Sequence, residues 1–136
     1  MTGTEQYIIK VSANQMRIIQ NALACFFRVR MGHFFDLAND IAFEGFNYKN
    51  HLDKEFSERA ERRIAAETLF DKGYLAATGG EWRKKTTDIE NAIDIWHVIR
   101  HQRWKDNPNR SDCTTDACEP FQIAGEPLCT VERVEE

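Results

Sequence analysis

Hydrophobic residues recur at steps of three and four positions in four segments of the chain, the spacing that places them on one face of an α-helix. The clearest of these segments is 88–105, and its face carries Ile89, Ile93, Trp96, Arg100 and Trp104. Acidic residues open the segment and basic residues close it, an order that suits the helix dipole. Thr87 followed by Glu90 is typical of a capping box. The sequence therefore predicts a helix over residues 88–105.

The other three segments predict helices over residues 12–31, 33–44 and 52–77. Gly32 and Gly45 stand where the first two helices should end, because glycine is the residue that most readily closes a helix. We expect the buried faces to consist of Met16, Ile19, Leu23, Phe26 and Phe27 in the first helix, Phe34, Phe35, Leu37 and Ile41 in the second, and Leu52, Phe56, Ala60, Ile64, Leu69, Phe70 and Tyr74 in the third.

The two ends of the chain have no helical period. Residues 6–11, rich in β-branched and aromatic side chains, predict a short strand. Residues 109–136 predict an extended tail or clasp that packs on the domain or pairs with residues 6–11, with disorder as the alternative. The expected fold is α+β but mainly α: a bundle of about four helices within one domain, residues 1–108, followed by the tail.

Composition narrows the class of protein. The chain has 136 residues, 42% of them hydrophobic and 29% charged, which is typical of one soluble domain. A net charge of -4 argues against binding of duplex nucleic acid. No apolar run approaches the roughly 20 residues of a membrane span, and the N-terminus lacks the pattern of a signal peptide. We therefore expect a cytoplasmic protein with four free cysteine thiols and no membrane partner.

Metal-site patterns are incomplete. His97 and His101 have the spacing of two zinc ligands, but a zincin helix needs glutamate where Val98 stands. Cys113 and Cys118 extend the pair only loosely toward a zinc site. A di-iron site would need a second carboxylate–histidine pair on another helix, and none is present. The sequence therefore predicts no metal or other cofactor.

Enzyme motifs are equally incomplete. Glu55, Glu58 and Glu61 resemble the magnesium-binding E-x-x-E of all-α nucleotide pyrophosphohydrolases, but the E-x-x-D that should follow is missing. A solvated face with ion pairs such as Glu55/Arg59 and Glu58/Arg62 is the favoured interpretation. There is no phosphate-binding glycine loop and no nucleophile elbow. We expect no enzyme activity.

Basic and aromatic residues gather at the end of the fourth helix. Arg100 lies one turn from both Trp96 and Trp104, and Arg28 and Arg30 should reach the same place if the first and fourth helices pack side by side. Arginine matches phosphate and aromatic rings stack on bases. The predicted ligand-binding residues are Arg100, Trp104, His101, His97, Arg28 and Arg30. The alternative is that Trp96 belongs to the core and that Arg100 pairs with Asp36 or Asp40.

Four stretches carry a resemblance to a known family: Tyr7–Ile19, Phe27–Gly32, Trp96–Asp106 and Thr114–Leu128. In these the chain resembles a family of small accessory proteins encoded by phages and prophages of Gram-positive bacteria. The resemblance covers nearly the whole chain, but it does not identify a reaction that the protein would catalyse. It implies an accessory protein that acts in the host cytoplasm, where such proteins counter host defence.

Two hypotheses of function follow. The first is a non-catalytic homo-oligomer that sequesters a nucleotide immune signal, either a cyclic nucleotide or an ADP-ribose derivative. The second is an inhibitor that binds a host defence protein through the acidic face of the third helix. A nucleotide pyrophosphohydrolase is the remaining alternative.

Overall fold

Helices make up most of the structure, a computed structural model that describes residues 5–48, 54–81, 86–108 and 114–135. The helices are α1 (Ala13–Arg30), α2 (Phe35–Ala42), α3 (Lys54–Thr78), α4 (Thr87–Asp106) and the four-residue α5 (Thr114–Ala117). The mainly α prediction with four main helices is confirmed. Within the described ranges there is no β-strand, so the strand predicted at residues 6–11 is not shown; those residues are in an extended segment.

Local signals fix the helix ends. At the start of α1, the backbone N–H of Ser12 donates to the Gln15 side chain at 2.8 Å and the Ser12 hydroxyl accepts from the Gln15 N–H at 3.1 Å, which is the expected capping box. Gly32 follows with a φ of 82°, which favours glycine. The cap of α4 is Thr86 rather than Thr87: its hydroxyl accepts the Ile89 N–H at 3.3 Å. The predicted capping box is therefore wrong: with Thr86 as the cap, the residue that would complete a box is Ile89, which has no polar side chain.

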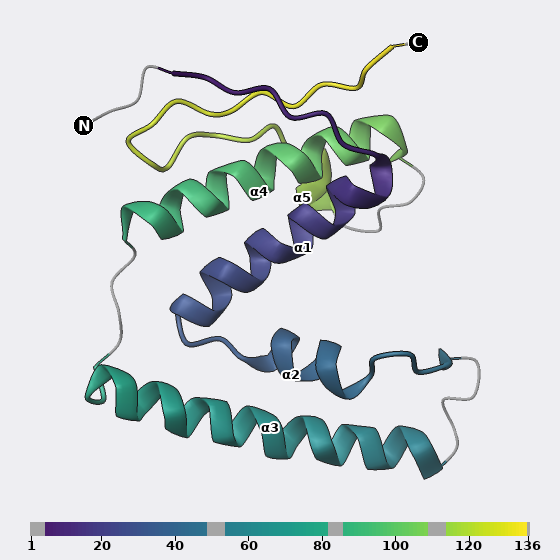
Figure 1. The fold of residues 1–136 in the computed structure, drawn as a ribbon, viewed down its shortest axis with the longest axis vertical. Helices are drawn as coiled ribbons and strands as arrows, with labels where there is room; N and C mark the ends of the chain where they lie inside the picture. Colours follow the sequence, from purple (N-terminus) through teal and green to yellow (C-terminus); the bar gives the residue numbers. More distant parts are fainter. Residues whose placement is uncertain (1–4, 49–53, 82–85, 109–113, 136) are drawn as a thin grey trace.

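The helices form two pairs. Figure 1 shows α1 and α4 lying across one another in one half, with the chain's two end segments running along α4, and α2 lying beside α3 in the other half. The core between α1 and α4 consists of Ala24, Phe27, Ile89, Ala92 and Ile93, with Leu23, Met31, Trp96 and Ile123 packed against it. This packing brings the end of α1 to the middle of α4, as the candidate site requires.

Aromatic rings connect α2 to α3. The ring centre of Phe34, just before α2, lies 5.8 Å from that of Phe70 and 5.6 Å from that of Tyr74, both in α3. The ring centres of Phe43, just after α2, and Phe56 of α3 are 5.4 Å apart. Several residues expected in buried faces are instead exposed: Phe26, Phe35, Ile41, Ile64 and Leu69. For these residues the predicted burial is wrong within the single chain. Leu52 lies outside the described residues.

The C-terminal segment is held by Asp94 of α4. This carboxylate is only 4% exposed, and it accepts backbone N–H groups from Ile123 at 3.2 Å and from Ala124 at 2.9 Å. Burial raises the pKa of the nearby Cys129 thiol, and the Asp94 charge adds to that rise. A buried carboxylate needs such donors, so the segment and the helix stabilise each other.

Candidate functional site

Two arginines from different helices meet at one tryptophan. The guanidinium of Arg28 on α1 lies 5.6 Å from the ring centre of Trp96, and that of Arg100 on α4 lies 4.1 Å from it. Phe27 meets the same indole edge-on, with ring centres 5.2 Å apart. Trp96 is half-buried against the core, so its orientation is fixed by packing. Both guanidinium groups lie at distances at which cation–π attraction holds them over the indole. We call Arg28, Trp96 and Arg100 the arginine–tryptophan site.

Each arginine of the site also holds a carboxylate. Arg28 pairs with Asp36 of α2 at 2.7 Å, and Arg100 pairs with Asp116 of α5. The expectation that Arg100 pairs with Asp36 or Asp40 is therefore wrong, because the C-terminal segment brings Asp116 to it. The two pairs differ in exposure: the side chains are 34% and 54% exposed in the first and 17% and 20% in the second. Water screens the Arg28 pair more, so that pair is the weaker one.

Two histidines border the site. The ring of His101 stacks on Trp104 with centres 5.7 Å apart and an interplanar angle of 22°. Its Nδ1 lies 3.0 Å from the backbone carbonyl oxygen of Asp116; a carbonyl can only accept, so this nitrogen donates. These contacts place His101 and Trp104 on the α5 side of Arg100.

His97 lies between the site and the C-terminal segment. Its ring centre is 5.1 Å from that of Trp96 and 6.4 Å from that of Phe121. Burial lowers the pKa of His97, the Arg100 charge lowers it further, and Asp94 partly opposes them. His97 therefore favours its neutral form beside Arg100.

Arg30 lies elsewhere. Its guanidinium is 4.3 Å from the ring centre of Phe26, while its backbone carbonyl accepts the Tyr74 hydroxyl of α3 at 3.1 Å. The structure thus brings Arg28, His97 and Arg100 to Trp96. It links His101, with Trp104 stacked on it, to Arg100 only through Asp116, and it places Arg30 against another ring. No sequence signal predicts Asp116 as a partner of the site.

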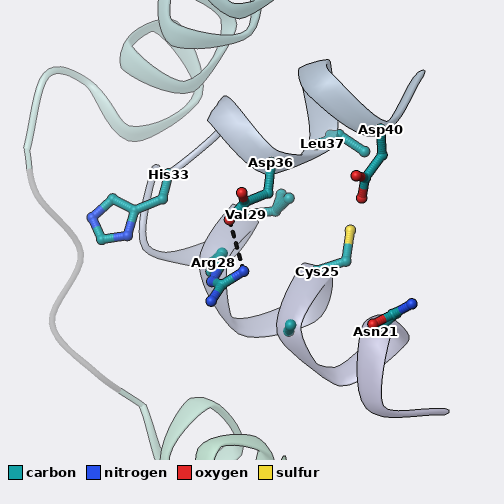
Figure 2. Close-up of a pocket in the computed structure, with 9 residues that line it drawn as sticks. Asn21, Cys25, Arg28, Val29, His33, Asp36, Leu37 and Asp40 are labelled. Carbon is teal, nitrogen blue, oxygen red and sulfur yellow. Dashed lines mark hydrogen bonds and ion pairs between the residues drawn. The ribbon is translucent and has the colours of Figure 1, made fainter. Parts of the chain in front are cut away.

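A hollow of about 230 Å³ adjoins the site between α1 and α2, and Arg28 belongs to both. Figure 2 shows Arg28 and Asp36 pointing toward one another and the Cys25 thiol pointing toward Asp40, whereas His33 points away from them. The lining is mostly polar, so the hollow suits a small polar group better than an apolar one.

Three acidic residues of α3, Glu55, Glu58 and Glu67, are engaged in ion pairs along the helix. Glu55 pairs with Arg59 at 2.8 Å, as predicted, whereas Glu58 pairs with Lys54 at 3.8 Å rather than with Arg62. In the described ranges no three metal-binding side chains cluster closely enough to hold an ion, and Cys113 lies outside those ranges. The described helices include none that is long and apolar enough to cross a membrane.

Comparison of the chain with protein families, with curated proteins and with solved structures finds no match in any of the three. What the arginine–tryptophan site can bind is therefore argued from its contacts and charges alone. Two guanidinium groups lie over one indole, each paired with a carboxylate, and a stacked imidazole and indole follow on the same helix. An anion carrying a flat ring can bind such a surface if it replaces a carboxylate.

Proposed function

We propose that the chain is a non-catalytic binding protein that sequesters a small nucleotide at the arginine–tryptophan site. The convergence of Arg28 and Arg100 on Trp96 supports this most directly. Guanidinium groups match the geometry of phosphate oxygens, and two of them serve the two phosphates of a cyclic dinucleotide or an ADP-ribose derivative. Sequestration requires affinity alone and no catalytic group.

Ligand phosphate exchanges with the carboxylates that the arginines now hold. The Arg28–Asp36 pair is half exposed, and pairs of that kind contribute only about 0–1 kcal/mol, so it yields first. The Arg100–Asp116 pair is less exposed and exchanges at a greater cost. A phosphate therefore anchors on Arg28 at the edge of the hollow, and a second phosphate then competes with Asp116 for Arg100.

The nucleobase of the ligand stacks on the flat rings beside the arginines. His101 and Trp104 already stack on each other at 5.7 Å, and a nucleobase stacks on such a surface with about 1–3 kcal/mol. The hollow of about 230 Å³ is smaller than the roughly 300 Å³ at which small-molecule pockets begin. The nucleotide therefore lies across the site and not inside the hollow, where Asp36 and Asp40 would repel a phosphate.

The biological setting of this proposal comes from the resemblance to phage accessory proteins. In that setting the protein acts as a homo-oligomer in the host cytoplasm and removes a nucleotide signal of host defence. The alternative of an inhibitor acting through the acidic face of α3 rests on exposed charges alone: Glu58 has an exposed partner, Lys54, at 3.8 Å, and Glu61 is exposed.

A thermal-shift screen tests the proposal. Cyclic dinucleotides, cyclic trinucleotides and ADP-ribose derivatives are compared with adenosine and inorganic phosphate as controls. A ligand at one hundred times its Kd stabilises the folded state by about 2.7 kcal/mol, which raises the Tm by several degrees. We expect such a rise with at least one of the two-phosphate nucleotides and not with the controls. Unchanged Tm values across all three nucleotide classes would contradict the proposal.

A further inference from the structure

The C-terminal segment is attached to α4 at two places that differ in depth. At the deeper place, the carboxylate of Asp94 accepts the backbone N–H groups of Ile123 and Ala124, and Ala124 is buried. At the other, the short helix α5 lies against α4 and its Asp116 is half-buried (Figure 1). Five of the six residues from 117 to 122 are exposed. Little apolar contact therefore holds residues 117–122, whereas the contact with Asp94 is firm.

Asp116 lies where two hydrogen-bond donors of α4 meet. The guanidinium of Arg100 pairs with its carboxylate, and Nδ1 of His101 donates to its backbone carbonyl at 3.0 Å. Stacking on Trp104 orients the His101 ring, and the indole of Trp96 orients the guanidinium. Two donors with fixed directions, one of them permanently charged, form a position that suits an anion. We call this position the Arg100–His101 subsite.

We propose that the Arg100–His101 subsite is a phosphate subsite and that residues 114–122 are an autoinhibitory strap, whose Asp116 occupies the subsite in the free protein. The inference rests on the proposed function, because it gives the second phosphate of the nucleotide its place. The oxygens of an ionised phosphate are acceptors, as are the carboxylate and carbonyl oxygens of Asp116. A phosphate can therefore replace Asp116 at both donors.

Release of the strap is local. Asp94 precedes Arg100 by roughly two turns of α4, and its bonds to Ile123 and Ala124 do not involve the subsite. A ligand that displaces Asp116 therefore frees residues 114–122 and leaves the rest of the segment in place. Amide hydrogens near a bound ligand normally exchange more slowly. A displaced strap has the opposite effect, because its amides lose their contacts with α4.

Amide hydrogen exchange, followed by NMR on the full chain with and without inorganic pyrophosphate, tests the strap. We expect pyrophosphate to speed exchange at residues 116–119 by about tenfold or more, while the amides of Ile123 and Ala124 keep their rates. Unchanged or slower exchange at residues 116–119 at the highest pyrophosphate concentration would overturn the strap.

Calorimetry with pyrophosphate tests the subsite. Asp116→Asn removes the competing charge, so this variant should bind pyrophosphate about tenfold more tightly than the wild-type protein. Glu119→Gln is the matched control, because it removes the same charge from an exposed residue of the strap, and it should leave the affinity unchanged. No tighter binding in Asp116→Asn than in Glu119→Gln would overturn the assignment of the subsite.

The second donor is tested in the Asp116→Asn background. His101→Phe keeps a ring that can stack on Trp104 and removes the Nδ1 donor, so we expect it to weaken pyrophosphate binding by about tenfold. Equal affinity with and without this substitution would remove His101 from the subsite and overturn the proposal as stated.

These results also separate the strap from nucleotide sequestration. Tighter pyrophosphate binding in Asp116→Asn, with no nucleotide raising the Tm, would support the subsite and contradict sequestration. A nucleotide that binds without faster exchange at residues 116–119 would support sequestration and overturn the strap.

Discussion

The carboxylate of Asp94 accepts the backbone N–H of Ala124 at 2.9 Å, although the two residues are 30 positions apart. Together with the bond from Ile123, this contact places the C-terminal segment against α4. The segment continues the chain from Asp116, the partner of Arg100, so its attachment also helps to define the arginine–tryptophan site.

Replacing Asp94 with asparagine should destabilise the protein. An amide has only one acceptor oxygen, so a buried N–H of the segment loses its charged partner, at a cost of about 1–3 kcal/mol in the free energy of unfolding. Urea unfolding followed by circular dichroism measures the loss. Asp88→Asn, an exposed change in the first turn of the same helix, is the control and should alter stability by roughly 0.5 kcal/mol or less. Equal effects of the two substitutions would show that Asp94 does not hold the segment.

Asp116 should compete with bound nucleotide. In Asp116→Asn the side chain keeps its shape and loses its charge, so Arg100 becomes more available to phosphate. We expect this variant to bind the nucleotide about tenfold more tightly, a gain of roughly 1.4 kcal/mol, and to have a lower Tm because a well-covered ion pair is lost. Titration calorimetry and thermal unfolding measure the two effects. Weaker binding would mean that Asp116 positions Arg100 rather than competing for it.

Stability should fall as the solution becomes mildly acidic, in part because of His97. Burial and the Arg100 charge hold the pKa of His97 below its usual value near 6.5. Between the folded-state pKa and 6.5, the unfolded chain therefore binds a proton that the folded protein does not. The free energy of unfolding decreases as the pH drops through this window.

His97→Gln tests the contribution of this histidine. Urea unfolding of the variant and of the wild-type protein at pH 7.5 and at pH 5.5 gives the difference. The wild-type protein should lose more stability than the variant between the two values. Identical losses would rule out a lowered pKa at His97.

The helices could be predicted because their signals are local. The apolar period of residues 88–105, the Ser12 capping box and the glycine after α1 each depend on residues within one or two turns. The bond partners of the site could not be predicted in this way. Asp36 and Asp116 reach Arg28 and Arg100 only through the chain's tertiary path, and no short-range spacing encodes that path.

The exposed apolar residues of α3 illustrate the other limit. A period of three and four identifies which residues share a face, and it correctly grouped Phe56, Phe70 and Tyr74 toward α2. This spacing does not show which other segment covers Ile64 or Leu69, because the burial of a side chain depends on the tertiary packing around it. The sequence predicted that Arg28 and Arg100 meet only if the first and fourth helices pack together. The structure shows that α1 and α4 do pack together.

Isothermal titration with a cyclic dinucleotide and with ADP-ribose tests nucleotide binding at the arginine–tryptophan site most directly. The variants are Arg28→Gln and Arg100→Gln, and the control is Arg17→Gln, an arginine at the other end of α1 that bonds Asn14. We predict that the wild-type protein binds at least one of these nucleotides, that each of the first two variants weakens the Kd by about tenfold or more, and that the control leaves it unchanged. Binding of neither nucleotide, or equal affinity in all four proteins, would contradict the assignment of this site.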